Sequence, residues 1–148
     1  MSFTDQINAD IKAAMLAKEK EKLAALRDIK SKLLLEATSG NGGEVTDEIG
    51  IKICQKLYKQ RMESYELYKQ QNREDLAADE LFQAQIIESY LPKQLSEDEI
   101  RTEVKKTIEE TGASSMKDMG KVMETLSSKL AGKADGKVIS GIVKELLS

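Results

Sequence analysis

Apolar residues recur every three or four positions along most of this 148-residue chain, and no run alternates apolar and polar residues as a half-buried strand would. This spacing places the apolar side chains on one face of a helix. Helix formers such as Ala, Leu, Lys, Glu and Gln dominate the composition, whereas aromatic residues make up 4% and proline occurs once. The sequence therefore predicts an all-α protein.

Two apolar stripes lie near the N-terminus, over residues 3–15 and 23–34. Ser2 or Thr4 is placed to cap the first stripe as a helix. The charged stretch 18–22 separates the stripes and leaves two alternatives open, a bend or one long helix. Either way, both stripes predict amphipathic helices.

The segment TSGNGG, residues 38–43, is the clearest loop in the sequence, because glycine and asparagine lower the cost of leaving a helix. After Thr46 or Asp47 a third stripe runs to about residue 71. A fourth stripe, which Asn72 can cap, follows it and completes an N-terminal part built from long amphipathic helices.

The single proline marks a boundary. Pro92 disfavours helix at the residue before it and removes a backbone donor, so the chain leaves the fourth helix there. Ser96 and Glu99 then fit a capping box, in which serine accepts from the third backbone N–H and glutamate reaches back. We therefore predict an N-terminal helical domain over residues 1–93 and a small C-terminal domain over residues 96–148.

Three further stripes predict a three-helix domain at the C-terminus. Gly112 ends the first helix, Ser115 caps the second, and Asp135 caps the third. Three methionines in the second stripe, at 116, 119 and 123, have two interpretations: core residues or an adaptable binding face for a partner. Their helical spacing favours the core.

The net charge of −3 excludes a polycation that would hold nucleic acid by bulk attraction. Residues 112–148 nevertheless carry six basic and four acidic residues, a local excess of +2. The first residues lack the basic region and apolar run of a signal peptide, and no later run approaches the roughly 18 apolar residues of a membrane span. We expect a cytoplasmic protein with no membrane partner.

The stretch GKADGK, residues 132–137, invites comparison with a phosphate-binding loop. Only three residues separate Gly132 from Gly136, a valine follows where a hydroxyl should bind metal, and no strand precedes it, so it is not a nucleotide loop. Two compatible interpretations remain. The stretch is a tight corner between helices, and Lys133 and Lys137 flank helix-start amides that suit a nucleic-acid phosphate. The candidate RNA-binding residues, whose four lysines we expect to form one basic patch, are Lys117, Lys121, Lys133, Gly136 and Lys137.

The sequence contains few residues that are suited to catalysis. The chain has no histidine, and its single cysteine, Cys54, lies in an apolar stripe, so nucleophile pairs with histidine are excluded and zinc sites lose their usual ligands. The carboxylate pairs Glu97/Glu99 and Glu109/Glu110 lie near helix ends, with no apolar run placed to raise a pKa. We therefore predict no catalytic residue, no metal and no cofactor.

Three ordered segments carry a resemblance to a known family: YLPKQLSEDEI (90–100), GASSMKDMGKVM (112–123) and GKADGKVIS (132–140). They resemble the YqeY (GatB/YqeY) family, small bacterial proteins related to the tail of GatB, a component of the glutamine-dependent aspartyl/glutamyl-tRNA amidotransferase. The segment QRMESYELYKQQNREDLAADE (60–80) resembles the same family less sharply. The resemblance implies an all-helical protein with an N-terminal helical domain and a three-helix tail domain.

The resemblance also has functional implications. In the amidotransferase the tail helps to hold the tRNA, and a similar domain is attached to some glutaminyl-tRNA synthetases. This implies a non-catalytic accessory protein that binds tRNA, or a tRNA-charging enzyme such as an aminoacyl-tRNA synthetase or the amidotransferase. Two alternatives stay open: a helical protein-interaction module without RNA contact, and a carbon–nitrogen ligase with glutamine as amide donor.

The boundary at Pro92 yields a first prediction. Under native conditions, backbone amides between Leu91 and Ser96 should be poorly protected from exchange with solvent, because a helix has ended and the next begins only at Ser96. Hydrogen–deuterium exchange followed by NMR measures this protection. One uninterrupted protected helix through Pro92 would contradict the prediction.

Overall fold

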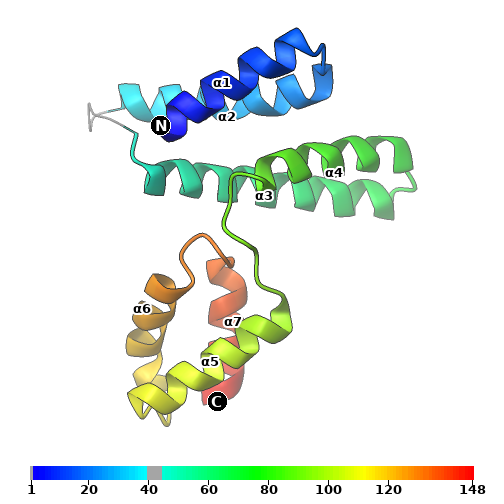
Figure 1. The fold of residues 1–148 in the computed structure, drawn as a ribbon. Coiled ribbons are helices and arrows are strands. Elements are labelled where there is room, and N and C mark those ends of the chain that lie inside the picture. Colours follow the sequence, from blue (N-terminus) through cyan, green and yellow to red (C-terminus); the bar gives the residue numbers. More distant parts are fainter. Residues whose placement is uncertain (1, 40–44) are drawn as a thin grey trace. The chain divides into compact units, whose positions relative to one another are not determined.

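The computed structural model describes residues 2–39 and 45–148. This described part contains seven α-helices, one short 3₁₀ turn and no strand (Figure 1), which confirms the all-α prediction. The chain divides into two compact units, one ending at Leu91 and the other spanning Pro92–Ser148. Each unit has its own hydrophobic core. Independent folding of the two predicted domains, residues 1–93 and 96–148, stays a prediction.

Among the described residues, the first unit contains four helices: α1 (Phe3–Leu16), α2 (Lys20–Thr38), α3 (Asp47–Gln70) and α4 (Glu74–Glu88). Ser2 caps α1 by accepting the Asp5 N–H at 3.1 Å, and Thr46 caps α3. Between α1 and α2 the chain bends rather than continuing as one helix, since Lys18 adopts φ 58°. Most of the predicted loop over residues 38–43 lies outside the described residues.

The turn between α3 and α4 differs from expectation. Asn72 does not cap α4, because the helix begins two residues later and Arg73 precedes it with no side-chain cap. Asn72 instead adopts φ 58°, a left-handed conformation that asparagine tolerates better than most residues. Its N–H donates to the carbonyl of Lys69 at 3.1 Å, and the Arg73 N–H donates to that of Tyr68 at 2.8 Å. Asn72 therefore makes the turn itself.

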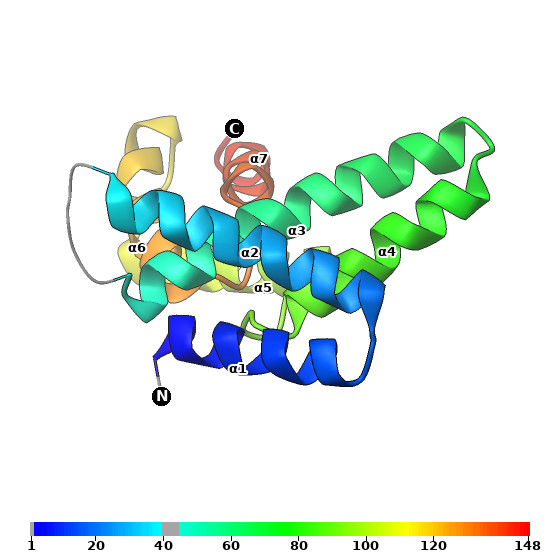
Figure 2. The ribbon, with the colours of Figure 1, turned by 90° about the horizontal axis from the view of Figure 1, so that it is seen from above.

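The four helices pack as two antiparallel pairs, α1 with α2 and α3 with α4, and α2 also packs on α4 (Figures 1 and 2). Small and aliphatic side chains fill the core between them: Ile7, Ala14, Leu26, Ile29, Leu33, Cys54, Leu57 and Ile87. Burial raises the pKa of the Cys54 thiol to about 12, so the thiol stays protonated at neutral pH. Cys54 is thus a small buried hydrophobe, as its position in an apolar stripe predicts.

A half-buried arginine joins three of these helices. The guanidinium of Arg61 on α3 binds the carboxylate of Asp28 on α2 and donates from Nε to Gln83 Oε1 on α4 at 2.9 Å. Glu80 on α4 lies 3.8 Å from the same Nε. A planar guanidinium presents several donors in fixed directions, so one side chain satisfies partners on two neighbouring helices at once.

The start of α1 is held against α3 and against the end of the unit. The Phe3 ring packs edge-on against Tyr90, with 6.0 Å between ring centroids, and the Tyr90 hydroxyl donates to the Asp10 carboxylate. Gly50 on α3 lies directly beneath Phe3, because a Cβ there would come within 2.6 Å of the ring. Burial and the hydrogen bond to Asp10 raise the pKa of Tyr90 well above its ordinary value.

Three α-helices and a 3₁₀ turn form the second unit: α5 (Glu97–Thr111), η1 (Met116–Asp118), α6 (Met119–Lys129) and α7 (Gly136–Leu147). The predicted capping box is confirmed, since Ser96 Oγ accepts from the Glu99 N–H and Glu99 Oε1 from the Ser96 N–H, both at 3.2 Å. Gly112 ends α5 with φ 69°, as predicted.

The second predicted helix has Ser115 as its N-cap, as predicted, but its first turn is a 3₁₀ turn. The tight turn η1 precedes α6, and Asp118 accepts the N–H groups of Ser114 at 3.0 Å and Ser115 at 3.4 Å. Of the methionines, Met119 and Met123 pack partly against the core, whereas Met116 is 44% exposed, so the core interpretation is wrong for Met116.

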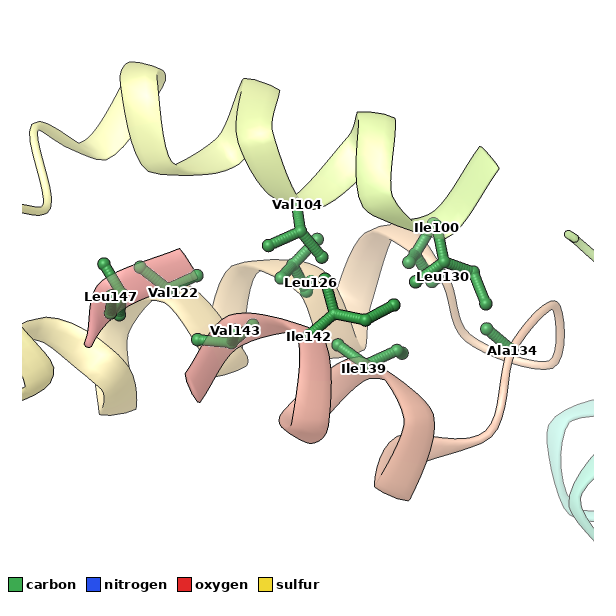
Figure 3. Close-up of a cluster of buried hydrophobic side chains, with 10 residues drawn as sticks. All are labelled: Ile100, Val104, Val122, Leu126, Leu130, Ala134, Ile139, Ile142, Val143 and Leu147. Atoms are coloured by element: carbon green, nitrogen blue, oxygen red, sulfur yellow. The ribbon is translucent and has the colours of Figure 1, made fainter. Parts of the chain in front are cut away.

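Aliphatic side chains from all three α-helices meet in the core of the second unit (Figure 3). Its buried members are Ile100, Val104, Val122, Leu126, Leu130, Ala134, Ile139, Ile142, Val143 and Leu147. Apart from Leu130 and Ala134, which follow α6, they come from one face of each helix, as the predicted stripes require. The alanine belongs to the loop between α6 and α7, which is therefore anchored in the core.

Thr107 on α5 yields a second prediction. Its side chain is fully buried, and Oγ1 has no hydrogen-bond partner among the described residues. Because an unsatisfied buried hydroxyl costs free energy, Thr107→Val should raise the free energy of unfolding by about 1 kcal/mol, measured by urea denaturation. Thr102→Val on the same helix is the control, since that exposed hydroxyl donates to the Asp98 carbonyl at 3.0 Å. A destabilised Thr107→Val protein would contradict the prediction.

Candidate functional site

The loop between α6 and α7 is held by hydrogen bonds on both sides. Within the loop, Gly132 adopts φ 75°, and the Lys133 N–H donates to the Leu130 carbonyl at 2.9 Å. From the segment before α5, the Leu95 N–H donates to the Lys133 carbonyl at 2.9 Å, and Gln94 Nε2 donates to the Gly132 carbonyl at 2.7 Å. The carbonyls of Gly132 and Lys133 are therefore fixed. Within the junction between Leu91 and Ser96, the backbone amide of Leu95 thus has a hydrogen-bond partner.

The residues of this loop and of the start of α7 differ in burial. Gly132 and Ala134 are buried, whereas Lys133, Gly136 and Lys137 are exposed. Because the backbone is held and the alanine is anchored in the core, the two lysines project from a fixed base into solvent.

Asp135 occupies the start of α7. Its Oδ1 accepts the Lys137 N–H at 3.3 Å, which confirms the predicted cap. Gly136 needs no special conformation, since a Cβ there would meet nothing within 4 Å. The interpretation of GKADGK as a corner between helices is thus correct for Gly132 and Asp135. At Gly136 the space where a side chain would lie is empty.

The other two candidate lysines lie at the opposite end of α6. Lys117 belongs to η1 and Lys121 to the first turn of α6, and both are exposed. The 11 residues of α6 span about 16 Å, and the loop with Lys133 and Lys137 follows its other end (Figure 1). The expectation of one patch of four lysines is therefore wrong, and the structure separates them into two pairs.

The four candidate lysines differ from Lys129 and Arg101 of the second unit in their surroundings. Lys129 Nζ lies 3.0 Å from Glu110 Oε2, and Arg101 Nη2 lies 3.1 Å from Glu145 Oε2. In the described part of the chain, no carboxylate comes within ion-pair distance of any of the four candidates. Their ammonium groups are therefore available to an external anion.

Comparison with known proteins identifies the family. The family model described as Yqey-like protein matches residues 4–147, nearly the whole chain. The chain belongs to the YqeY-like family. This assignment agrees with the resemblance carried by the three C-terminal motifs.

Two curated relatives are both named "Altered inheritance of mitochondria protein 41, mitochondrial". The one from Clavispora lusitaniae is 31% identical over 90 residues, which cover 61% of this chain and 52% of the relative. That from Vanderwaltozyma polyspora is 32% identical over 119 residues, which cover 76% of this chain and 64% of the relative. The chain thus spans about half to two thirds of the length of these relatives.

The carboxylate pairs of this YqeY-like protein are solvated. Glu97, Glu99, Glu109 and Glu110 are all exposed. The hydrogen bond from the Ser96 backbone lowers the pKa of Glu99, and that from Lys129 lowers the pKa of Glu110. A general acid at neutral pH needs the opposite shift. Among the described residues, no group of three or more His, Cys, Asp or Glu side chains is placed to hold a metal ion.

Within the described segments, no helix is long and apolar enough to cross a membrane. The cytoplasmic location stays a prediction from the sequence.

The loop geometry yields a third prediction. Gly132→Ala should lower the free energy of unfolding by about 1 to 2 kcal/mol, because a Cβ is disfavoured at φ 75°. Asp135→Ala should cost about 1 kcal/mol through loss of the cap. Gly136→Ala is the matched control and should be neutral or slightly stabilising, because its Cβ meets open space. Thermal unfolding followed by circular dichroism ranks the three, and equal losses at both glycines would contradict this account.

Proposed function

We propose that this YqeY-like protein is a non-catalytic accessory protein that binds tRNA through the loop between α6 and α7. One observation carries the proposal: Lys133 and Lys137 project, without an ion-pair partner among the described residues, from a backbone fixed by hydrogen bonds. A fixed backbone removes the cost of ordering the loop when the two lysine side chains bind phosphates.

The lysine side chains, rather than the end of the helix, make this contact. The Asp135 carboxylate already accepts the Lys137 N–H, so it occupies part of the helix start and repels a phosphate placed directly on the axis. An RNA strand would therefore pass beside the cap, where both ammonium groups reach its phosphates. Binding of this kind is sequence-independent and depends steeply on salt, because each lysine–phosphate contact releases counterions.

Family membership supports the same function. The resemblance to the tail of GatB covers the capping box before α5, the start of α6 and the loop before α7. In the amidotransferase that tail helps to hold tRNA, so an aminoacyl-tRNA synthetase or the amidotransferase is the protein partner that fits the proposal. A carbon–nitrogen ligase activity has less support, because the chain has no histidine and its one thiol is buried with a pKa of about 12.

A second candidate function is a protein-interaction module. Leu34 and Leu35 on α2 are 55% and 61% exposed. A pocket of about 300 Å³ also lies between α2 and α3, lined by Lys32, Glu36, Ile53, Lys56, Leu57 and Gln60. Exposed leucines on a helix surface suit apolar side chains of a partner protein. Capture of a protein that persists at high salt, together with no affinity for tRNA, would favour this candidate.

The RNA proposal yields a fourth prediction. Replacing both Lys133 and Lys137 by Glu should weaken tRNA binding and flatten its salt dependence, since each lost contact removes roughly 0.7 to 0.9 from the slope of log affinity against log salt. Fluorescence anisotropy with labelled bulk tRNA at several salt concentrations measures this. Lys117→Glu with Lys121→Glu is the matched control, an equal charge change at the other end of α6 that should leave the slope close to that of the wild type.

Helicity should barely change in either double variant, because such surface substitutions alter stability by about 0.5 kcal/mol or less. If the wild type and the Lys133→Glu/Lys137→Glu protein are both folded and show the same affinity and slope, the loop is a helix corner and the proposal fails.

A further inference from the structure

We propose that Lys93 is a third phosphate-binding residue of the loop site, positioned there by Gln94. This inference rests on the proposed function and extends it to a residue far from the loop in sequence. Lys93 lies in the junction before α5, 40 residues before Lys133. The chain nevertheless brings the two lysines to one surface of the second unit.

Two hydrogen bonds join the junction to the loop. The Leu95 N–H donates to the Lys133 carbonyl at 2.9 Å, and Gln94 Nε2 donates to the Gly132 carbonyl at 2.7 Å. The same Nε2 donates to the Pro92 carbonyl at 2.9 Å, on the other side of Lys93. Lys93 therefore lies between Gln94, which is bonded to the loop, and Pro92, whose carbonyl accepts from the same Gln94 amide.

Covalent geometry limits how far apart the lysines lie. Standard bond lengths and the 2.9 Å bond from Leu95 to Lys133 keep the two lysine Cα atoms within about 11 Å of each other. Gln94 and Leu95 are half-buried, and Leu95 packs against the core of the unit, whereas Lys93 is exposed. The anchored neighbours hold the backbone, and the lysine side chain remains in solvent within reach of a strand that contacts Lys133.

The acidic residues that follow Lys93 at the start of α5 interact with other groups. The charge of Lys93 contributes to lowering the pKa of Glu99, but Glu99 Oε1 accepts the Ser96 N–H at 3.2 Å in the capping box. Glu97 lies 3.6 Å from Arg101 one turn further on. Among the described residues Lys93 itself has no carboxylate within ion-pair distance, so its charge adds to that of Lys133 and Lys137.

A salt titration of tRNA binding tests this inference on the full chain. Lys93→Gln should make the fall of log affinity with log salt less steep by roughly 0.7 to 0.9. It should also reduce the affinity about fivefold at 0.15 M salt. Lys105→Gln is the matched control, an exposed lysine of α5 in the same unit. It should behave as the wild type, and circular dichroism should show both variants folded.

The outcomes separate this inference from the proposed function. If the wild type shows no salt-dependent binding of tRNA, both fail together. If the wild type binds and Lys133→Gln with Lys137→Gln lowers the slope while Lys93→Gln does not, the proposed function stands and the role of Lys93 is overturned.

Gln94 is a positioning residue, and a double-mutant cycle tests it. Gln94→Ala removes the amide that bridges Pro92 and Gly132. If this bridge positions Lys93, Lys93→Gln should lower the slope in the wild-type background and change it little in the Gln94→Ala background. Equal losses in both backgrounds would show that the Gln94 amide does not position Lys93. A general loss of stability would not produce this coupling in the salt slope.

Discussion

The structure of this protein depends on how the unpaired backbone groups at its helix ends find hydrogen-bond partners. The first N–H groups and last carbonyls of an α-helix have no partner inside it, and α6 and α7 have only 11 and 12 residues, so these groups make up much of the second unit. The capping box at Ser96, the carboxylate of Asp135 and the left-handed Gly112 satisfy many of them locally. Beyond the end of α6, the loop carbonyls of Gly132 and Lys133 accept from Gln94 and Leu95, which fixes the loop that carries the candidate site.

Features that depend on a few neighbouring residues were predictable from the sequence. The capping box follows from a serine and a glutamate three residues apart, and the stop at Gly112 follows from glycine's tolerance of positive φ. Asn72 was misassigned because asparagine suits both a cap and a left-handed turn, and only the connection between α3 and α4 decides between them. Lys117 and Lys121 were joined to the wrong patch because periodicity reports the face of a helix and not which of its ends meets a given loop.

Interactions between distant segments had no local signal. Gln94 reaches Gly132 across 38 residues, and Arg61 reaches Asp28 across 33 and Gln83 across 22. Each of these polar residues looks like ordinary helix or loop surface in the sequence. In the candidate site, too, the local feature was predictable and the long-range one was not. The exposure of Lys133 and Lys137 follows from the loop composition, whereas the hydrogen bonds between the loop and the segment around Lys93 form only in the folded unit. A chain with a net charge of −3 can thus present a local cluster of positive charge.

The missing side chain at Gly50 sets the spacing between α1 and α3, because any Cβ there would lie 2.6 Å from the Phe3 ring. Phe3 also packs on Tyr90, which lies beyond the last turn of α4, just before the first unit ends at Leu91. A larger residue at position 50 would displace Phe3 and leave Tyr90, near the point where the chain leaves the unit, with only its hydrogen bond to Asp10 on α1. The beginning and the exit of the N-terminal unit are therefore mechanically linked through a residue that has no side chain.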